Sequence, residues 1–422
     1  MINKTVLKNG VRIVTSPVKD AQSLAIGIWI STGSRNEIPE YLGISHYLEH
    51  LVFKGTRNYS CQEIKESIEG KGGSINAFTS EEATCYLVKL PAKYLELALD
   101  ILSDMVLNPL LPEAEIEKER TVILEEIKMY KDLPQSYVYE LLDELLWPEQ
   151  PLGRSILGTI ESVNRIKKQD LDGYRKRYYT ASNIVVSASG LLNHAKFSQK
   201  VREKFLGLKE ASRNIFAPAY IGQAAPQARI FPKDTEQTHF VLGFHGLSRD
   251  HKLKYALSLL NVILGGNSSS RLFDEIREKR GLAYEIGTGV KRLKDTGAFV
   301  VHAGVDNNKV VQTLKLIFGQ LRRAKAETVS RPEFLRAKEF LLGQLMLALE
   351  DTMDQMLWIG ESTTSLDKTF TLSQVIREVN KVKIADLKQV AKLIFKKENL
   401  NLALIGPFKS EEEHIHKELN FE

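Results

Sequence analysis

The order of strand-like and helix-like segments in the first half of the chain recurs in the second half. Alternating apolar residues at 25–30 precede a helical pattern at about 43–53, and a strand pattern at 239–244 precedes a helical pattern at 252–264. Pro112-Glu113 and Pro332-Glu333 each open a later helical stretch. The repeat length of roughly 210–220 residues is too long for a solenoid unit and is typical of a duplicated domain.

Each half places its strands mainly before runs of helices, which predicts an α+β fold of two homologous domains. In each domain we expect a mostly antiparallel sheet packed against helices. The 422 residues exceed the length of a single core, in agreement with two domains. The predicted domains are residues 1–207 and 228–422, joined by an aperiodic linker at 208–227.

The segments that support this division have clear boundaries. In the first domain we expect strands at 11–15, 25–30, 74–79, 84–90 and 184–188, and helices at about 43–53, 60–70, 91–107, 112–131, 134–146 and 193–206. In the second domain we expect strands at 239–244, 283–291 and 297–305, and helices at 252–264, 270–281, 307–324 and 332–350.

The first predicted helix carries His46-Tyr-Leu-Glu49-His50. Residues four apart lie on one face of a helix, so His46 and His50 can direct their imidazoles to one point. Neutral imidazole is a preferred zinc ligand, and Glu49 lies close enough to act as a base beside a metal. This order of residues is the H-x-x-E-H signature of the inverzincins. A catalytic zinc needs a third protein ligand, which must come from elsewhere in the chain.

The predicted helix at 112–131 supplies the candidate for that ligand. Glu119 and Glu126 are seven residues apart, nearly two turns, and therefore project from one face. Glu125 is turned about 100° away and is expected to be solvated. Glu126 is thus the predicted third ligand, with Glu119 as a supporting carboxylate. The residues expected to make this face buried are Val122, Ile123 and Tyr130.

His46-x-x-Glu49-His50, followed by Glu119-Arg-Thr-Val-Ile-Leu-Glu-Glu126, resembles the pitrilysin family of zinc peptidases, and particularly its short-chain branch of mitochondrial processing peptidases and their bacterial relatives. The resemblance extends over essentially the whole chain. It implies that His46, His50 and Glu126 hold one zinc ion, that Glu49 is the catalytic base and that Glu119 supports the site. It also implies that the two domains form half of the four-domain clam shell of longer family members.

The second half does not repeat the ligand set, so no zinc is expected there. The residues at the equivalent positions are Ala256 or Leu257, Leu260 or Asn261, Ala337 and Gln344. Arg277 and Tyr284, with Gly281-Leu282 between them, match a pair that the family keeps in its zinc-free half. The resemblance implies that both face the active site and bind substrate. A guanidinium and a phenol can each donate to a peptide carbonyl or its oxyanion.

Asn76, Ala77 and Phe78 lie in a predicted strand that resembles the substrate-binding edge strand of the family. Such a strand pairs with an extended peptide by β-augmentation. Small Ala77 would allow close approach, and the Asn76 amide could contact a substrate carbonyl.

Composition excludes several other functions. The 58 basic and 53 acidic residues are balanced, and no basic run carries the interleaved aromatic residues of a nucleic-acid site. No apolar run reaches the length of a membrane span, and the N-terminus lacks the pattern of a signal or transit peptide. Two cysteines, Cys61 and Cys85, make no disulfide framework. We therefore expect a cytoplasmic protein that binds neither nucleic acid nor membrane.

The sequence thus predicts a zinc metalloendopeptidase that hydrolyses oligopeptides or short extended segments. Because one chain carries both the zinc ligands and the Arg277–Tyr284 pair, a homodimer is the simplest way to complete the chamber. Two alternatives share the fold: a catalytically silent scaffold and a peptide-binding subunit without turnover.

Overall fold

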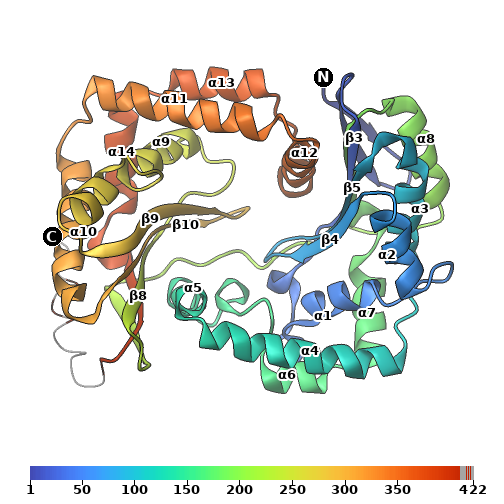
Figure 1. The fold of residues 1–422 in the computed structure, drawn as a ribbon, viewed down its shortest axis with the longest axis horizontal. Helices are drawn as coiled ribbons and strands as arrows, with labels where there is room; N and C mark the ends of the chain where they lie inside the picture. Colours follow the sequence, from blue (N-terminus) through green and yellow to red (C-terminus); the bar gives the residue numbers. More distant parts are fainter. Residues whose placement is uncertain (409–414, 416, 418, 420–422) are drawn as a thin grey trace. The chain divides into compact units, whose positions relative to one another are not determined.

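The computed structural model describes residues 1–408, 415, 417 and 419. The chain separates into two compact units (Figure 1). The first unit contains Met1–Lys128, Ser155–Ala217 and Met346–Leu372. The second contains Met129–Arg154, Pro218–Leu345 and the described residues from Ser373 onward.

A six-stranded sheet in the order β1-β2-β6-β3-β5-β4 forms the centre of the first unit. Only the β2–β6 pair is parallel. The strands are β1 (Asn3–Val6), β2 (Arg12–Pro17), β3 (Ser23–Ile30), β4 (Ser74–Thr79), β5 (Thr84–Pro91) and β6 (Ile184–Gly190). Because side chains alternate along a strand, Ile26 and Ile28 of β3 face one core while Ala25 and Trp29 face another.

Helices pack on the Ile26 side of this sheet and enclose the larger core. They are α1 (Ile44–Val52), α2 (Cys61–Glu69), α3 (Leu95–Leu107), α4 (Glu113–Asp132), α6 (Ile160–Arg165), α7 (Lys168–Tyr178) and α8 (His194–Phe205). Figure 1 shows α1, α2 and α3 on this one face of the sheet. Helix α2 begins at a capping box, in which Ser60 accepts from the Glu63 amide.

The second unit repeats this plan with a five-stranded sheet in the order β7-β11-β8-β10-β9, counted over the described residues. The strands are β7 (Gln227–Pro232), β8 (Gln237–His245), β9 (Ala283–Arg292), β10 (Gly297–Asp306) and β11 (Leu400–Gly406). The helices are α9 (Lys254–Leu264), α10 (Val310–Ala326), α11 (Arg331–Ala348), α13 (Leu372–Lys381) and α14 (Ile384–Ile394), together with a π-helical segment at Phe273–Glu278.

The strand orders β2-β6-β3-β5-β4 and β7-β11-β8-β10-β9 correspond strand for strand, which confirms the predicted duplication. The β7–β11 pair is parallel, as the β2–β6 pair is. Equivalent strands begin at Ser23 and Gln237, and at Ile184 and Leu400, within the predicted repeat length. The strands and helices listed from the sequence for both halves are present with small shifts at their ends, except that the helix predicted at 270–281 is the π-helical segment Phe273–Glu278.

Each half of the sequence contributes one helix that packs on the sheet of the other half. Helix α12 (Thr352–Leu366) follows α11 in the chain but packs on the Trp29 side of the first sheet, where Met356 and Ile359 are buried. Helix α5 (Pro134–Leu146) follows α4 but packs on the second sheet, where Leu141 and Leu142 are buried against β8 and β11.

Polar contacts fasten α12 to the first sheet. Asp351, which caps the helix by accepting from the Met353 amide, pairs with Lys89 at 2.5 Å. At the other end, Arg12 donates to the Thr363 carbonyl oxygen at 2.9 Å. Gly360 permits the close approach, because a Cβ there would overlap Trp29 Nε1 and lie 2.7 Å from Ser187 Oγ.

The compact units therefore differ from the predicted contiguous domains 1–207 and 228–422 in residues 129–154 and 346–372. An amphipathic pattern shows that a helix needs an apolar partner but not which sheet supplies it. The predicted linker has no helix or strand between residues 208 and 226. Within the described part of the chain, no helix is both long and apolar enough to cross a membrane.

Candidate metal site

Helix α1 presents both histidines of the motif on one face. Their ring centroids are 4.6 Å apart, with the rings inclined at 64°. The opposite face of the helix inserts Tyr47, Leu48 and Leu51 into the core of the first unit. The apolar residues thus fix the rotation of α1, and that rotation directs His46 and His50 toward α4.

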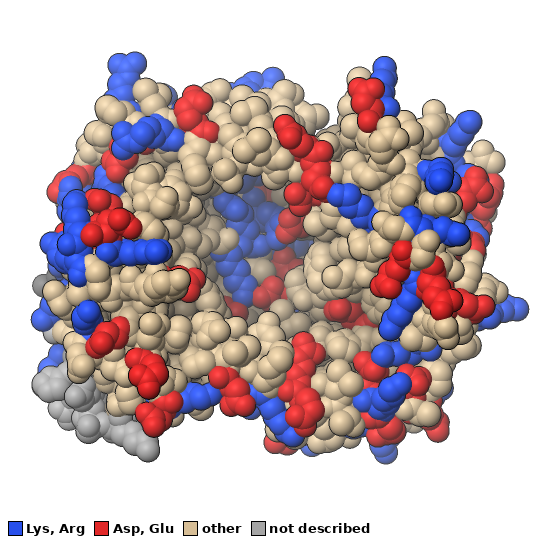
Figure 2. Space-filling model, in the orientation of Figure 1, with Lys and Arg blue, Asp and Glu red and all other residues tan. Residues whose placement is uncertain are grey.

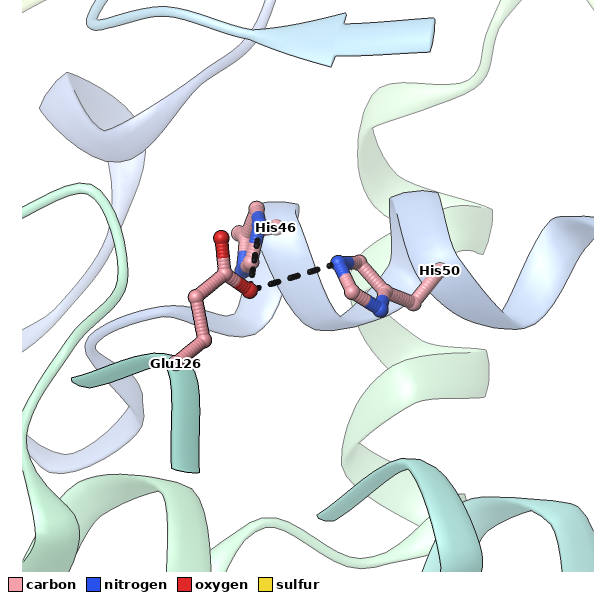
Figure 3. A group of neighbouring side chains, drawn as sticks. All are labelled: His46, His50 and Glu126. Atoms are coloured by element: carbon pink, nitrogen blue, oxygen red, sulfur yellow. Dashed lines mark ion pairs between the residues drawn. The ribbon is translucent and has the colours of Figure 1, made fainter. Parts of the chain in front are cut away.

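Glu126 approaches from α4, and one of its carboxylate oxygens pairs with both imidazoles (Figure 3). Its Oε2 atom is 3.7 Å from His46 Nε2 and 3.7 Å from His50 Nε2. Glu125 points elsewhere, is 65% exposed and pairs with Lys128. The helical phase predicted from the sequence therefore places these two adjacent carboxylates as expected.

Of the three residues expected to bury the Glu119–Glu126 face of α4, only one is buried. Ile123 is buried, but Val122 is 46% and Tyr130 is 37% exposed. The buried stripe of α4 runs through Ile116, Glu119, Ile123 and Ile127. Glu126 lies on the shoulder of that stripe, Val122 lies further round the helix, and Tyr130 lies near its end.

The three side chains fit a divalent metal ion such as zinc. Two atoms that are each about 2.1 Å from a tetrahedral zinc lie roughly 3.4 Å apart, close to the 3.7 Å observed. Within the described residues, His46, His50 and Glu126 are the only group of three or more possible ligands whose atoms lie within 4.8 Å of one another. Two imidazoles and one carboxylate leave a fourth position for water or substrate.

The electrostatic surroundings suit metal binding. Burial, and then the neighbouring His50, lowers the pKa of His46 to about 3, so its imidazole is neutral and can act as a ligand. Glu119 Oε2 lies 3.1 Å from His50 Nδ1, and its Oε1 lies 2.5 Å from Lys54 Nζ. Burial would raise the pKa of Glu119, but the bonds from Lys54 and His50 hold it below its usual value. An ionised Glu119 favours the His50 tautomer that donates from Nδ1 and leaves Nε2 free for metal.

Glu49 lies in the same helix, α1, but is not one of the three clustered ligands. Thr79, at the end of β4, donates from Oγ1 to Glu49 Oε2 at 2.5 Å. Burial raises the pKa of Glu49, an effect that this hydrogen bond partly offsets. Glu49 is thus held by one oxygen at the junction of α1 and β4.

The strand that carries Asn76, Ala77 and Phe78 is an edge of the first sheet, because β4 pairs only with β5 among the described strands. Asn76 and Phe78 are exposed. The Asn76 Oδ1 atom accepts the Ala77 amide at 2.8 Å, so its own nitrogen is the group left to contact a carbonyl. The Phe78 ring stacks edge-on against Trp29.

Arg277 and Tyr284 lie together in the second unit. The Arg277 guanidinium carbon is 4.7 Å from the Phe273 ring centroid and 5.4 Å from that of Tyr284. Tyr284 is 76% exposed on edge strand β9. Arg277 lies in the π-helical segment, where the sequence predicted an ordinary helix. That both residues reach substrate stays a prediction.

Sequence reasoning missed Thr79 and Lys54 as members of the site. Lys54 is four residues after His50, a spacing that could have indicated a shared side of the helix, although α1 ends at Val52. Thr79 gave no local signal, because its contact with Glu49 depends on how β4 packs beside α1.

Family models and relatives named as zinc proteases match this chain. The family model described as insulinase (peptidase family M16) matches residues 12–160, and the peptidase M16 inactive domain matches residues 165–341. The zinc protease YmxG of Bacillus subtilis, named as uncharacterized, is 39% identical over 96% of this chain and 98% of its own length. A Streptomyces coelicolor protein with a similar name is 36% identical over 97% of this chain and 91% of its own length.

Two solved structures have the same fold. A protease from Helicobacter pylori superposes with a TM-score of 0.90 at 25% identity, covering 96% of this chain and 100% of that protein. A Pseudomonas fluorescens structure described as a peptidase M16 inactive domain gives a TM-score of 0.88 at 19% identity, covering 96% of this chain and 98% of that one. With full-length relatives above 30% identity and both domain models matched in order, the chain belongs to peptidase family M16, to which the pitrilysin-like short-chain peptidases belong.

Proposed function

We propose that this chain is a zinc-dependent endopeptidase that hydrolyses oligopeptides or short extended segments. The observation that carries the proposal is the convergence of His46, His50 and Glu126 beside Glu49, which supports a metal site with a base next to it. The names of the relatives as zinc proteases favour zinc as the metal.

Zinc held by these ligands supplies Lewis acidity, which polarises a peptide carbonyl and acidifies water. Glu49 then takes a proton from water and delivers it to the leaving amine. Its Oε2 is held by Thr79, so we assign the proton transfer to Oε1, which has no hydrogen-bond partner among the described residues. Burial keeps this carboxylate from being fully solvated, which strengthens it as a base.

The edge strand β4 is the proposed place for substrate, which would add as a further strand beside Asn76, Ala77 and Phe78. Thr79 at the end of the same strand holds Glu49, so a peptide on β4 would lie next to the base. We propose that Arg277 and Tyr284 donate to the substrate backbone or to the developing oxyanion.

The proposed assembly is a homodimer, because one chain carries both the zinc ligands and the Arg277–Tyr284 pair. We propose a cytoplasmic location, where the free thiols of Cys61 and Cys85 would remain reduced.

Zinc content and cleavage of a quenched peptide test the proposal together. Purified protein should contain about one zinc per chain, and chelation should abolish cleavage until zinc is restored. Glu49→Gln should keep zinc but lose nearly all turnover, because a neutral amide cannot accept the proton. Loss of zinc in proportion to activity in that variant would make Glu49 a ligand and refute its assignment as base.

The same measurements separate the alternatives. A peptide-binding subunit would hold zinc and peptide without cleavage in any assembly state, whereas a scaffold would show neither tight zinc binding nor cleavage. Sedimentation of the zinc-loaded protein would test the homodimer.

A further inference from the structure

The start of α1 lacks the cap that its own sequence would normally provide. Residue Gly43 occupies the N-cap position at φ +86°, and neither a capping side chain nor an acidic residue is present in the first turn. The first four amides of a helix have no partner within the helix. A helix that begins without a cap is prone to fraying at its first turn.

His46 lies in that first turn, because α1 begins at Ile44. Its ring has little other support. Whereas His50 Nδ1 is bonded to Glu119, the buried His46 Nδ1 has no hydrogen-bond partner among the described residues. Metal-binding histidines usually gain their orientation from such a partner. The position of His46 therefore depends on the backbone of the first turn and on packing.

A carboxylate from outside the helix holds this backbone. Glu37 is 4% exposed, and its Oε2 accepts from the Gly43 amide at 2.7 Å while its Oε1 accepts from the Ser45 amide at 2.8 Å. Both oxygens thus bind amides on either side of the first helical residue. Charge-assisted bonds to a helix N-terminus are strengthened by the helix dipole. The Ser45 hydroxyl is also bonded to Tyr174 at 2.7 Å.

We propose that Glu37 is a positioning residue of the metal site: its carboxylate fixes the first turn of α1 and thereby holds His46 in register with His50 and Glu126. The inference rests on the proposed metal function. Glu37 itself would contact neither metal nor substrate. It would act by holding the first turn of α1, which has no capping side chain of its own, and so keep the ligand His46 in place.

The test is the zinc dissociation constant, measured by chelator competition on the full chain. In Glu37→Gln one amide acceptor is replaced by an NH₂ group that faces an N–H donor. We expect zinc to bind about 10–100-fold more weakly, the range for changes that orient a ligand. The visible spectrum of the cobalt-substituted variant should change as well, because the His46 ligand is displaced.

Ser60→Ala is the matched control. It removes the cap of the neighbouring helix α2 and so lowers stability, but α2 carries no ligand. Its zinc affinity and cobalt spectrum should remain those of the wild type. If Glu37→Gln and Ser60→Ala lower zinc affinity equally at equal loss of stability, the effect is general and the proposal is wrong.

A measurement on the unaltered protein keeps the test valid if Glu37→Gln does not fold. In metal-free protein the Gly43 and Ser45 amides should already exchange slowly with deuterium, because Glu37 holds them. Rapid exchange that becomes slow only after zinc is added would mean that the metal orders the turn, and would overturn the proposal. Wild-type protein that binds no zinc would instead refute the proposed function itself.

Discussion

The adjacent carboxylates Glu125 and Glu126 allow a sharp test of the metal site. Glu126 Oε2 is 3.7 Å from both imidazole Nε2 atoms, while Glu125 is 65% exposed and pairs with Lys128. Glu126→Gln and Glu125→Gln make the same chemical change one residue apart on one helix. Any general effect on α4 is therefore common to both variants.

The expected magnitudes differ widely. Because imidazole binds a metal in its neutral form, Glu126 would be the one anionic ligand of the three, and Glu126→Gln would remove the negative charge that balances the metal. Changes outside the ligand set already cost 10–100-fold, so we expect Glu126→Gln to weaken zinc binding by at least about 100-fold, or about 2.7 kcal/mol. An exposed ion pair contributes only about 0–1 kcal/mol to stability and nothing to the metal, so Glu125→Gln should bind zinc as the wild type does, within about threefold.

Competition with a chelator of known affinity measures both dissociation constants, and elemental analysis measures the zinc retained after dialysis. Equal losses in the two variants would refute the argument from helical phase. Normal zinc binding by Glu126→Gln would show that its carboxylate is not a ligand, whatever its distance from the histidines.

Outcomes for four further variants are expected. Glu119→Gln should weaken zinc binding by about 10–100-fold, between the two variants above, because His50 loses a charged partner. Tyr284→Phe should keep zinc while kcat/KM falls about 100-fold or more; unchanged cleavage would mean that the phenol does not act in catalysis. Gly360→Ala should lower the denaturation midpoint, because overpacking against Trp29 costs about 1–3 kcal/mol and outweighs a helix-propensity gain of about 1 kcal/mol. Gly343→Ala, where a Cβ meets no atom within 4 Å, should raise the midpoint instead, and a rise in both variants would contradict the close packing of α12.

The sequence was sufficient where a signal is local. The spacing of His46 and His50 and the phase of Glu119 and Glu126 both depend on helix periodicity within one segment. Duplication was equally visible, because it repeats the order of whole segments.

Contacts between distant segments could not be predicted in this way. The bond from Thr79 to Glu49 depends on the placement of β4 beside α1. The exposure of Val122 depends on which face of α4 meets the core, and a mixed-charge helix gives a weak signal for that. Helix α12 packs on the first sheet because Gly360 and Trp29 fit closely together, and this fit cannot be predicted from the sequence pattern.

A ribosome completes the last strand of the first sheet at Gly190 but must continue to Leu366 before α12 can emerge. Until then the face of that sheet around Trp29 and Val185 remains uncovered. For helix α5 the order is reversed: α5 is synthesised before β8, so its apolar face has no sheet to pack on until the second sheet has formed. Both units should therefore mature together only after α12 and β11 have been made, with slow folding dominated by contacts between distant residues. A fragment ending at residue 207 would lack α12, so it would expose an apolar sheet face and aggregate rather than persist as a small zinc protein.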